Sequence, residues 1–171
     1  DDVMRPSRCL ADFVAPKGKV QDHVGVFAVT AGIGTEKKEA QFLAAHDDYS
    51  AILLKSLADR LAEAFAECLH KKLRTDLWGY AADEHLAASD LIAEKYQGIR
   101  PAPGYPACPD HSVKKDMFEL LQCADIGMTV TESLAMSPAA SVSGFFLGHP
   151  AAVYFNVGKV GADQLQDLAA R

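Results

Sequence analysis

The segment around Arg100 carries the side chains of this 171-residue chain that are best suited to hold a small charged molecule. Four prolines fall within residues 98–111, GIRPAPGYPACPDH. Proline lacks an N–H and biases the residue before it toward extended geometry, which predicts a stiff, irregular segment with free backbone groups. A guanidinium binds a carboxylate through two hydrogen bonds, and free peptide groups can bind the edge of a heterocycle. The alternative is a proline-stiffened surface loop in which Arg100 caps the preceding helix.

Three neighbours of Arg100 could complete such a site. The peptide groups of Ala102 are candidates for contact with a heterocycle, and Gly104 would let a ligand approach the backbone closely. Tyr105 adds a ring face and a hydroxyl. The segment therefore favours a ligand that combines a carboxylate with a heterocycle.

A second group of candidate side chains is acidic. Asp59, Glu63 and Glu67 are spaced four residues apart, so a helix would place them on one face. Like charges at this spacing destabilise a helix mildly unless a cation meets them, which makes a docking surface one hypothesis. The other hypothesis is a solvated helix face with Arg60 and Lys71 nearby.

The composition narrows the classes of function. A formal net charge of −6 argues against nucleic acid as the main partner, because phosphate binding requires clustered Lys and Arg. No apolar run is long enough to span a bilayer, and the four cysteines lie far apart without a C-x-x-C pair, which favours a reduced, cytoplasmic protein. P-loop, dinucleotide-binding, nucleophile-elbow and zinc-site patterns are absent, so no catalytic residue and no metal ligand is predicted.

The helices that must position these residues follow from periodicity. Asp47 and Asp48 offer an N-cap, and no Gly or Pro follows until after Trp78, which predicts one long helix over about 47–78. Its apolar residues recur every three or four positions and are expected to form one buried stripe: Leu54, Leu57, Leu61, Ala64 or Phe65, Cys68 and Leu69. Shorter helices are predicted over 87–96, 113–123 and 162–171, the second with its inward residues at Met117, Leu120 and Leu121.

Four runs rich in β-branched and aromatic residues or in alternating apolar positions predict strands. They cover residues 22–31, 128–133, 140–148 and 151–160. Gly148, His149 and Pro150 between the last two suit a hairpin. Helices are interspersed with these strands, which indicates an α+β fold with a mainly antiparallel, twisted β-sheet flanked by helices.

Several segments, in order along the chain, resemble the reactivation domain at the C-terminal end of cobalamin-dependent methionine synthase. Residues 96–111 contain that family's S-adenosylmethionine motif, R-x-x-x-G-Y, at Arg100, Gly104 and Tyr105. The other matching segments are CLADFVAP, DHVGVFAVTAG, HDDYS, ADRLAEAFAE with the later WGY, TESLAMSPAASVSG and the pair Tyr154–Phe155. The motif alone is weakly specific, whereas the ordered set, over roughly residues 9–168, is strongly so.

The resemblance implies roles for the candidate ligand-binding residues. Arg100 would hold the methionine carboxylate of S-adenosylmethionine, the backbone at Ala102 would meet the adenine, and Tyr105 would lie close to the ligand. Tyr154 and Phe155 match the family's second aromatic contact, which suits a sulfonium because a ring face attracts a cation. Without the resemblance, these two residues would be interpreted as a strand pair with one ring in the core and one outside.

The resemblance also implies domain limits. Residues 9–171 would form the S-adenosylmethionine-binding reactivation domain, and residues 1–8 a terminal tail. A further acidic ligand contact of the family falls in an upstream segment that this chain lacks, so the domain is expected to be without its N-terminal part.

Partners follow from the same resemblance. Asp59 and Glu63 resemble acidic positions that face the cobalamin-binding domain during reactivation, and Glu94 resembles an acidic position close to the ligand-binding segment. A flavodoxin-type or diflavin reductase would supply one electron, and S-adenosylmethionine bound here would donate the methyl group that converts inactive cob(II)alamin to methylcobalamin. Cobalamin and zinc would be bound by other domains of the full-length methyltransferase, so this chain would not be catalytically complete on its own.

Two other classes of function stay open from the sequence. One is an interaction module that binds no ligand and docks a cobalamin domain or a reductase through its acidic helix. The other is a self-contained methyltransferase that uses S-adenosylmethionine with its own acceptor.

Overall fold

The computed structural model describes residues 8–170 of the chain. The tail predicted over residues 1–8 therefore lies outside the described residues, except for Arg8. Within the described range, no helix combines the length and the apolar character needed to cross a membrane.

One long helix organises the molecule. α2 (Asp48–Lys72) continues directly into a π-helix, η2 (Leu73–Leu77), so the helical conformation is unbroken across both. The Asp47 carboxylate accepts a hydrogen bond from the Ser50 N–H at 3.0 Å and so caps the first turn. These bounds confirm the helix predicted over 47–78.

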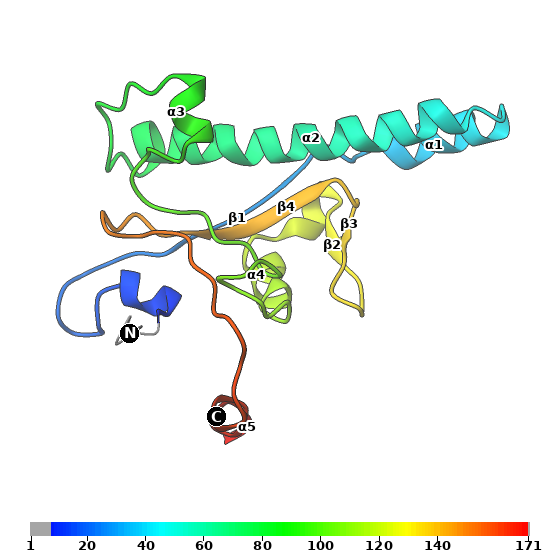
Figure 1. Ribbon diagram of the computed structural model, residues 1–171. Coiled ribbons are helices and arrows are strands. Elements are labelled where there is room, and N and C mark those ends of the chain that lie inside the picture. The colour runs from blue at the N-terminus through cyan, green and yellow to red at the C-terminus, as the bar shows by residue number, and fades with distance from the viewer. Residues whose placement is uncertain (1–7, 171) are drawn as a thin grey trace.

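α2 lies across one face of a two-stranded antiparallel sheet (Figure 1). β1 (Gly25–Thr30) pairs with β4 (Ser141–Phe146) along the full length of both strands. The rings of Phe27 and Phe146 stack with their centroids 4.5 Å apart, and they form the core of this layer together with Val29 and the α2 residue Ala66. The sheet and α2 are the frame on which the rest of the chain is placed.

Short elements cover the opposite face of the sheet, where the alternate side chains of β1 and β4 point. They are α4 (Lys114–Leu120), η3 (Cys123–Ile126), β2 (Thr129–Val130) and β3 (Met136–Ser137), with β2 and β3 paired antiparallel. Their buried side chains are those of Met117, Phe118, Cys123 and Met128, which pack against Val26, Ala28 and Phe145 of the sheet.

The remaining elements lie at the periphery. α1 (Thr35–Ala44) packs along α2, and together they form an arm that extends beyond the sheet (Figure 1). η1 (Leu10–Phe13) and α3 (Ala88–Ile92) are short, and α5 (Ala162–Ala170) stands apart at the C-terminal end. Helices interspersed with antiparallel strand pairs confirm the predicted α+β class, although α1 had no counterpart among the sequence predictions.

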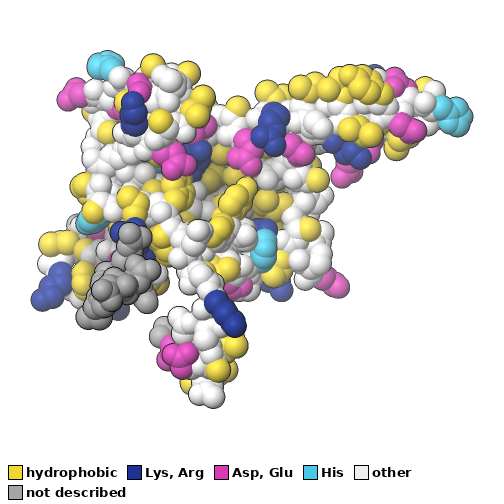
Figure 2. Space-filling model, viewed as in Figure 1, with side chains coloured by type: hydrophobic (Ala, Val, Ile, Leu, Met, Phe, Trp, Pro, Cys, Tyr) yellow, Lys and Arg dark blue, Asp and Glu magenta, His cyan; other side chains and the backbone are white. Residues whose placement is uncertain are grey.

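The buried face of α2 is not the predicted one. The buried side chains of α2 are small, apart from one histidine: Ala51, Ala58, Ala62, Ala66 and His70. Ala66 packs against the sheet residues Phe27, Val29 and Phe146. Three larger side chains of the predicted stripe point outward: Leu57, Leu61 and Phe65 are at least half exposed, at 53%, 61% and 50%. Leu69, at the end of the stripe, is partly buried and packs against the core as predicted. Hydrophobic side chains accordingly line the projecting arm in Figure 2. The prediction was wrong because it gave weight to size, whereas the narrow space between α2 and the sheet accepts alanine.

The strand predicted over 151–160 is also absent. This segment is extended and mostly exposed, and it has no ladder partner. Both edges of β4 are already occupied, because β1 pairs along one edge and the Phe145 N–H donates to the Pro101 carbonyl at 2.9 Å on the other. The predicted hairpin therefore cannot form, and a different segment takes its place beside β4.

Two shorter helices also differ from their predictions. α3 ends at Ile92, four residues before the predicted limit. In α4 the inward residues are Met117 and Phe118, whereas Leu120 is 71% exposed because the helix ends at that residue and Gln122 turns the chain with φ 52°. Leu121 also lies at the surface.

The alanine face of α2 predicts a clear asymmetry between two adjacent positions. Ala62→Leu should lower the free energy of unfolding by about 1–3 kcal/mol, because the added atoms overpack the contact with the sheet. Leu61→Ala should change it by no more than ~0.5 kcal/mol, because Leu61 faces solvent. Urea denaturation of both variants measures the difference. A larger loss for Leu61→Ala than for Ala62→Leu would contradict the observed packing.

Candidate functional site

A cavity of about 460 Å³ opens between α2, the proline-rich segment and the segment after β4. Figure 2 shows hydrophobic and acidic side chains together on this side of the molecule, below α2. The residues that line the cavity are Phe27, Glu63, Glu94, Arg100, Pro101, Ala102, Tyr105, Pro106, Ala107, Val142, Tyr154, Phe155 and Asn156. Its volume is in the range of pockets that hold a small ligand or cofactor.

The backbone at Arg100 is fixed as an added strand beside β4. The N–H and carbonyl groups of Ile99 and Leu147 exchange hydrogen bonds of 2.9 and 3.0 Å, and the Pro101 carbonyl accepts from Phe145. Gly144 makes this approach possible, because a Cβ at that position would lie 2.6 Å from the Pro101 carbonyl oxygen. The Arg100 side chain therefore starts from a defined point, between Ile99, which is paired with Leu147 directly after β4, and Pro101, which is bonded to β4.

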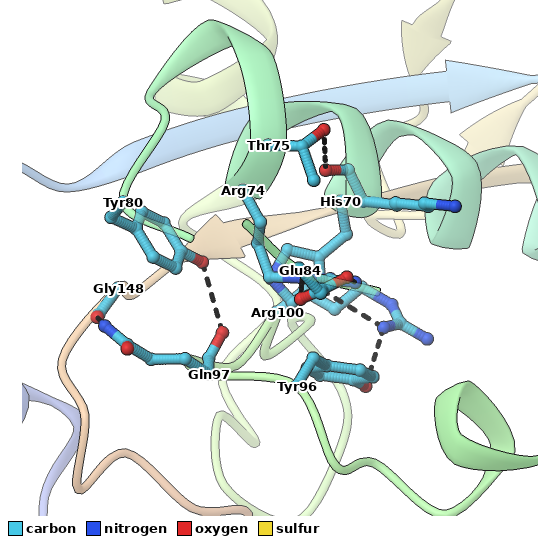
Figure 3. Close-up of polar contacts among 10 residues, drawn as sticks. His70, Arg74, Thr75, Tyr80, Glu84, Tyr96, Gln97, Arg100 and Gly148 are labelled. Carbon is cyan, nitrogen blue, oxygen red and sulfur yellow. Dashed lines mark hydrogen bonds and ion pairs between the residues drawn. The ribbon is translucent and has the colours of Figure 1, made fainter. Parts of the chain in front are cut away.

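The guanidinium of Arg100 is held by three groups. Its Nη2 forms an ion pair with Glu67 Oε2 at 2.5 Å. Its Nη1 donates to the Tyr96 hydroxyl at 2.8 Å and lies 3.3 Å from Nδ1 of His70, as Figure 3 shows. In addition, the Arg100 N–H donates to the Tyr154 hydroxyl at 3.0 Å. Charge-assisted bonds of this kind define both the position and the orientation of the planar group.

A buried ion pair between Arg74 and Glu84 lies next to the side chains that hold Arg100. Arg74 is fully buried and binds Glu84 through two hydrogen bonds, Nε–Oε2 at 2.7 Å and Nη2–Oε1 at 2.8 Å. The Arg74 guanidinium lies 4.3 Å from the centre of the Tyr96 ring, and the His70 ring meets the same ring edge-on at 5.0 Å. The Arg100 guanidinium lies 5.7 Å from the centre of the same ring, and Figure 3 shows the Tyr96 hydroxyl bonded to it. The ring is therefore locked, and with it the hydroxyl that binds Arg100.

His70 is neutral in this environment. Burial lowers its pKa to about 3, and the charges of Arg74 and Arg100 add to the effect. Because an arginine can only donate, the contact with Arg100 requires that Nδ1 be the acceptor and that the proton reside on Nε2. Nε2 has no hydrogen-bond partner among the described residues.

One residue of the proline-rich segment that lines the cavity, Ala102, has a free backbone donor. In the part of the chain that the structure describes, the Ala102 N–H makes no hydrogen bond. The Ala102 carbonyl accepts from Tyr105 at 3.2 Å, and the Gly104 N–H donates to Cys108 at 2.7 Å, so the turn is internally closed. Gly104 has φ 98°, and a Cβ there would collide with the His111 ring. Glycine is therefore required at position 104 by the conformation of the turn and by the His111 ring. Gly104 itself does not line the cavity.

The structure brings most of the predicted site residues together. Seven of them line the cavity: Arg100, Ala102, Tyr105, Tyr154 and Phe155 of the ligand-binding set, with Glu63 and Glu94 of the docking set. Asp59 is exposed on α2, one turn before Glu63, and lies outside the lining. Arg100 does not cap the preceding helix, because α3 ends at Ile92 and the guanidinium meets α2.

Three residues of the site had no predicted role as partners of Arg100. They are Glu67, His70 and Tyr96. A weak signal was present, since Glu67 and His70 are three residues apart and so share a face of the predicted helix. Nothing in the sequence indicated that this face would meet Arg100.

The cavity can bind a ligand that carries a negative charge, a positive charge and a heterocycle. It offers a fixed cation at Arg100, a free N–H at Ala102, aromatic rings and two carboxylates, Glu63 and Glu94. The described lining contains no serine, cysteine, histidine or lysine. The arrangement suits binding and orientation of a ligand.

Comparison with known proteins places this geometry in a family. Residues 1–171 match the family model for the activation domain of vitamin B12-dependent methionine synthase. The chain belongs to this family. Its fold is also that of a solved relative, the crystal structure of the MetH reactivation domain bound to AdoHcy, with a TM-score of 0.90 and 52% sequence identity. The match covers 95% of this chain and 50% of the solved chain, so this activation-domain chain spans about half the length of that relative.

The low pKa of His70 predicts a loss of stability in acid. Its ordinary pKa is 6.5 and its pKa in the fold is about 3, so the unfolded chain takes up the proton first as the pH falls. This contribution to stability is complete above about pH 6.5 and declines toward pH 3, with a slope of up to ~1.4 kcal/mol per pH unit. Urea denaturation at several pH values, beside a His70→Gln variant that should lack this contribution, measures it. An NMR titration in which the His70 ring is protonated between pH 7 and pH 5 would contradict the prediction.

Proposed function

We propose that this chain binds S-adenosylmethionine in the cavity around Arg100. Within a cobalamin-dependent methionine synthase, it would thereby support the reductive methylation of cob(II)alamin to methylcobalamin. The single observation that carries the proposal is the fixed guanidinium of Arg100 in a cavity of about 460 Å³ that is also lined by Ala102, whose N–H is free. Membership of the activation-domain family and the relative bound to AdoHcy support the same class of ligand.

The carboxylate and the adenine of S-adenosylmethionine each have a candidate partner in the lining of the cavity. The carboxylate would bind Arg100, whose fork is the geometric complement of a carboxylate. The adenine would meet the free Ala102 N–H, because an adenine edge offers ring nitrogens as acceptors. The rings of Tyr105 and Tyr154 would provide apolar and cation-attracting surface.

The charge of the cavity suits a sulfonium. Glu63 and Glu94 both line it, from α2 and from the segment after α3. A sulfonium carries a permanent positive charge, so two carboxylates facing the same space favour it over a neutral thioether. The protein's contribution to methyl transfer is then to hold this methyl group in line with its acceptor, which requires no protein base.

The acceptor and the electron would come from outside this chain. Cobalamin, bound by another domain, supplies the cobalt that accepts the methyl group, and zinc belongs to a further domain of the methyltransferase. We propose that Asp59 and Glu63 on α2, with Glu94, form the face that meets the cobalamin-binding domain. All three are exposed, Glu63 and Glu94 line the cavity, and Asp59 lies one helical turn before Glu63. A flavodoxin-type or diflavin reductase is the proposed electron donor. The free thiols of all four cysteines suit a reducing, cytoplasmic location.

The binding proposal predicts a selective effect of Arg100. Calorimetric titration of S-adenosylmethionine into this chain should give saturable binding, and Arg100→Ala should weaken it by about 1.5–3 kcal/mol, because a charge-assisted hydrogen bond is lost. Arg60→Ala removes the same charge from an exposed position on α2 and should change binding by less than ~0.5 kcal/mol. Absence of binding by a folded wild-type chain would favour the alternative, a docking module without a ligand.

The docking proposal predicts that the carboxylates of α2 contribute to association. The double variant Asp59→Asn, Glu63→Gln should weaken binding of a separately produced cobalamin domain by roughly 0.5–2 kcal/mol, because exposed charge pairs each contribute ~0.2–1 kcal/mol. Glu132→Gln changes the charge of an exposed residue on the opposite side of the sheet and serves as the control. Surface plasmon resonance at low and high salt measures both. Equal affinities of the double variant and the control would contradict the proposed face.

A further inference from the structure

We infer that Glu67 is a positioning residue for the carboxylate of the ligand, acting through Arg100. The inference rests on the proposed function and assigns a role to a residue outside the cavity lining. Glu67 Oε2 lies 2.5 Å from Arg100 Nη2, and the two side chains are only 27% and 21% exposed. Glu67 does not line the cavity, so a ligand bound there would meet Arg100 and not Glu67.

The contacts of Arg100 leave one edge of its guanidinium free. A guanidinium has five N–H donors, two on each Nη and one on Nε. Tyr96 and His70 occupy Nη1, and Glu67 takes one donor of Nη2. One donor of Nη2 and the Nε–H remain without a partner among the described residues, on two nitrogens joined to the same carbon. A carboxylate can accept hydrogen bonds from donors on both nitrogens.

The contact with Glu67 determines which donors of the Arg100 guanidinium stay free for a ligand. Tyr96 and His70 both contact Nη1, and neither contact sets the direction of Nη2. The Glu67 contact supplies the third point and so prevents the planar group from rotating about Nη1. Without Glu67, the long arginine side chain would regain several rotamers, and a ligand would have to order it on binding.

Glu67 also balances the charge of the partly buried arginine. Arg74 is close to the same Tyr96 ring, so two cations share this region and only Arg74 has Glu84 as its counter-ion. His70 is neutral and cannot compensate Arg100. Glu67 is thus the carboxylate that allows Arg100 to stay in the site before any ligand binds.

A carboxylate beside Arg100 could instead compete with the ligand, and the two roles predict opposite results. Competition requires the ligand carboxylate to replace Glu67 on the same donor. The free donors of Arg100 make replacement unnecessary. Positioning is therefore the role that the geometry supports.

The test compares two ligands that differ only in the carboxylate. S-adenosylmethionine and decarboxylated S-adenosylmethionine are titrated into the wild-type chain and into Glu67→Ala, Glu67→Gln and Glu119→Gln, the last a matched charge change on α4. We expect Glu67→Ala to weaken S-adenosylmethionine binding about tenfold, which corresponds to ~1.4 kcal/mol, and to change binding of the decarboxylated ligand by less than about twofold. Glu67→Gln keeps an acceptor but loses the charge, so it should give a smaller loss with the same selectivity, and Glu119→Gln should give none.

Three results would overturn the inference. Tighter binding of S-adenosylmethionine by the Glu67 variants would show competition. An equal loss for both ligands would show a purely structural role, and no change for either would show that Glu67 is dispensable. Thermal unfolding of each variant without ligand identifies any variant that fails to fold, in which case Glu67→Gln carries the comparison. A wild-type chain that binds neither ligand would contradict the proposed function itself, which separates that failure from a failure specific to Glu67.

Discussion

A partly buried arginine needs compensation for its charge and contacts that hold its planar group in place, and the site of this protein is organised around meeting that need for Arg100. α2 contributes Glu67 and His70, and the loop after α3 contributes Tyr96. The buried Arg74–Glu84 pair then fixes Tyr96 by lying against its ring. Because each member is held by another, the guanidinium has one position in the absence of ligand, and such preorganisation lowers the entropic cost of binding.

The packing of α2 on the sheet sets the distances of this network. Alanine at the contact positions lets the helix approach β1 and β4 closely, and His70 continues the same face where the cavity begins. On the sheet side, Gly144 lets the proline-rich segment pair against β4 and so carries Arg100 to within reach of α2. Larger residues at either contact would separate Arg100 from Glu67, so the packing of the core and the geometry of the site depend on the same small residues.

The sequence predicted the long helix and most of the cavity lining, because a strong N-cap, an uninterrupted helical run and the ordered family segments are local signals. It did not predict which face of α2 is buried, because leucine and alanine are both compatible with a core and only the distance to the sheet decides between them. The strand over 151–160 was wrong for a related reason: composition gives strand propensity, but the availability of a sheet edge depends on Ile99 and Pro101, which lie far away in the chain. The links from Arg100 to Glu67 and to His70 are likewise long-range.

A crystal structure of this chain with S-adenosylmethionine or AdoHcy would show directly whether the ligand binds in the cavity around Arg100. We expect the ligand carboxylate on the free donors of the Arg100 guanidinium, Nε and Nη2, with the Glu67 contact retained and the adenine at the Ala102 N–H. A ligand bound elsewhere, or bound in the cavity with its carboxylate away from Arg100, would contradict this expectation.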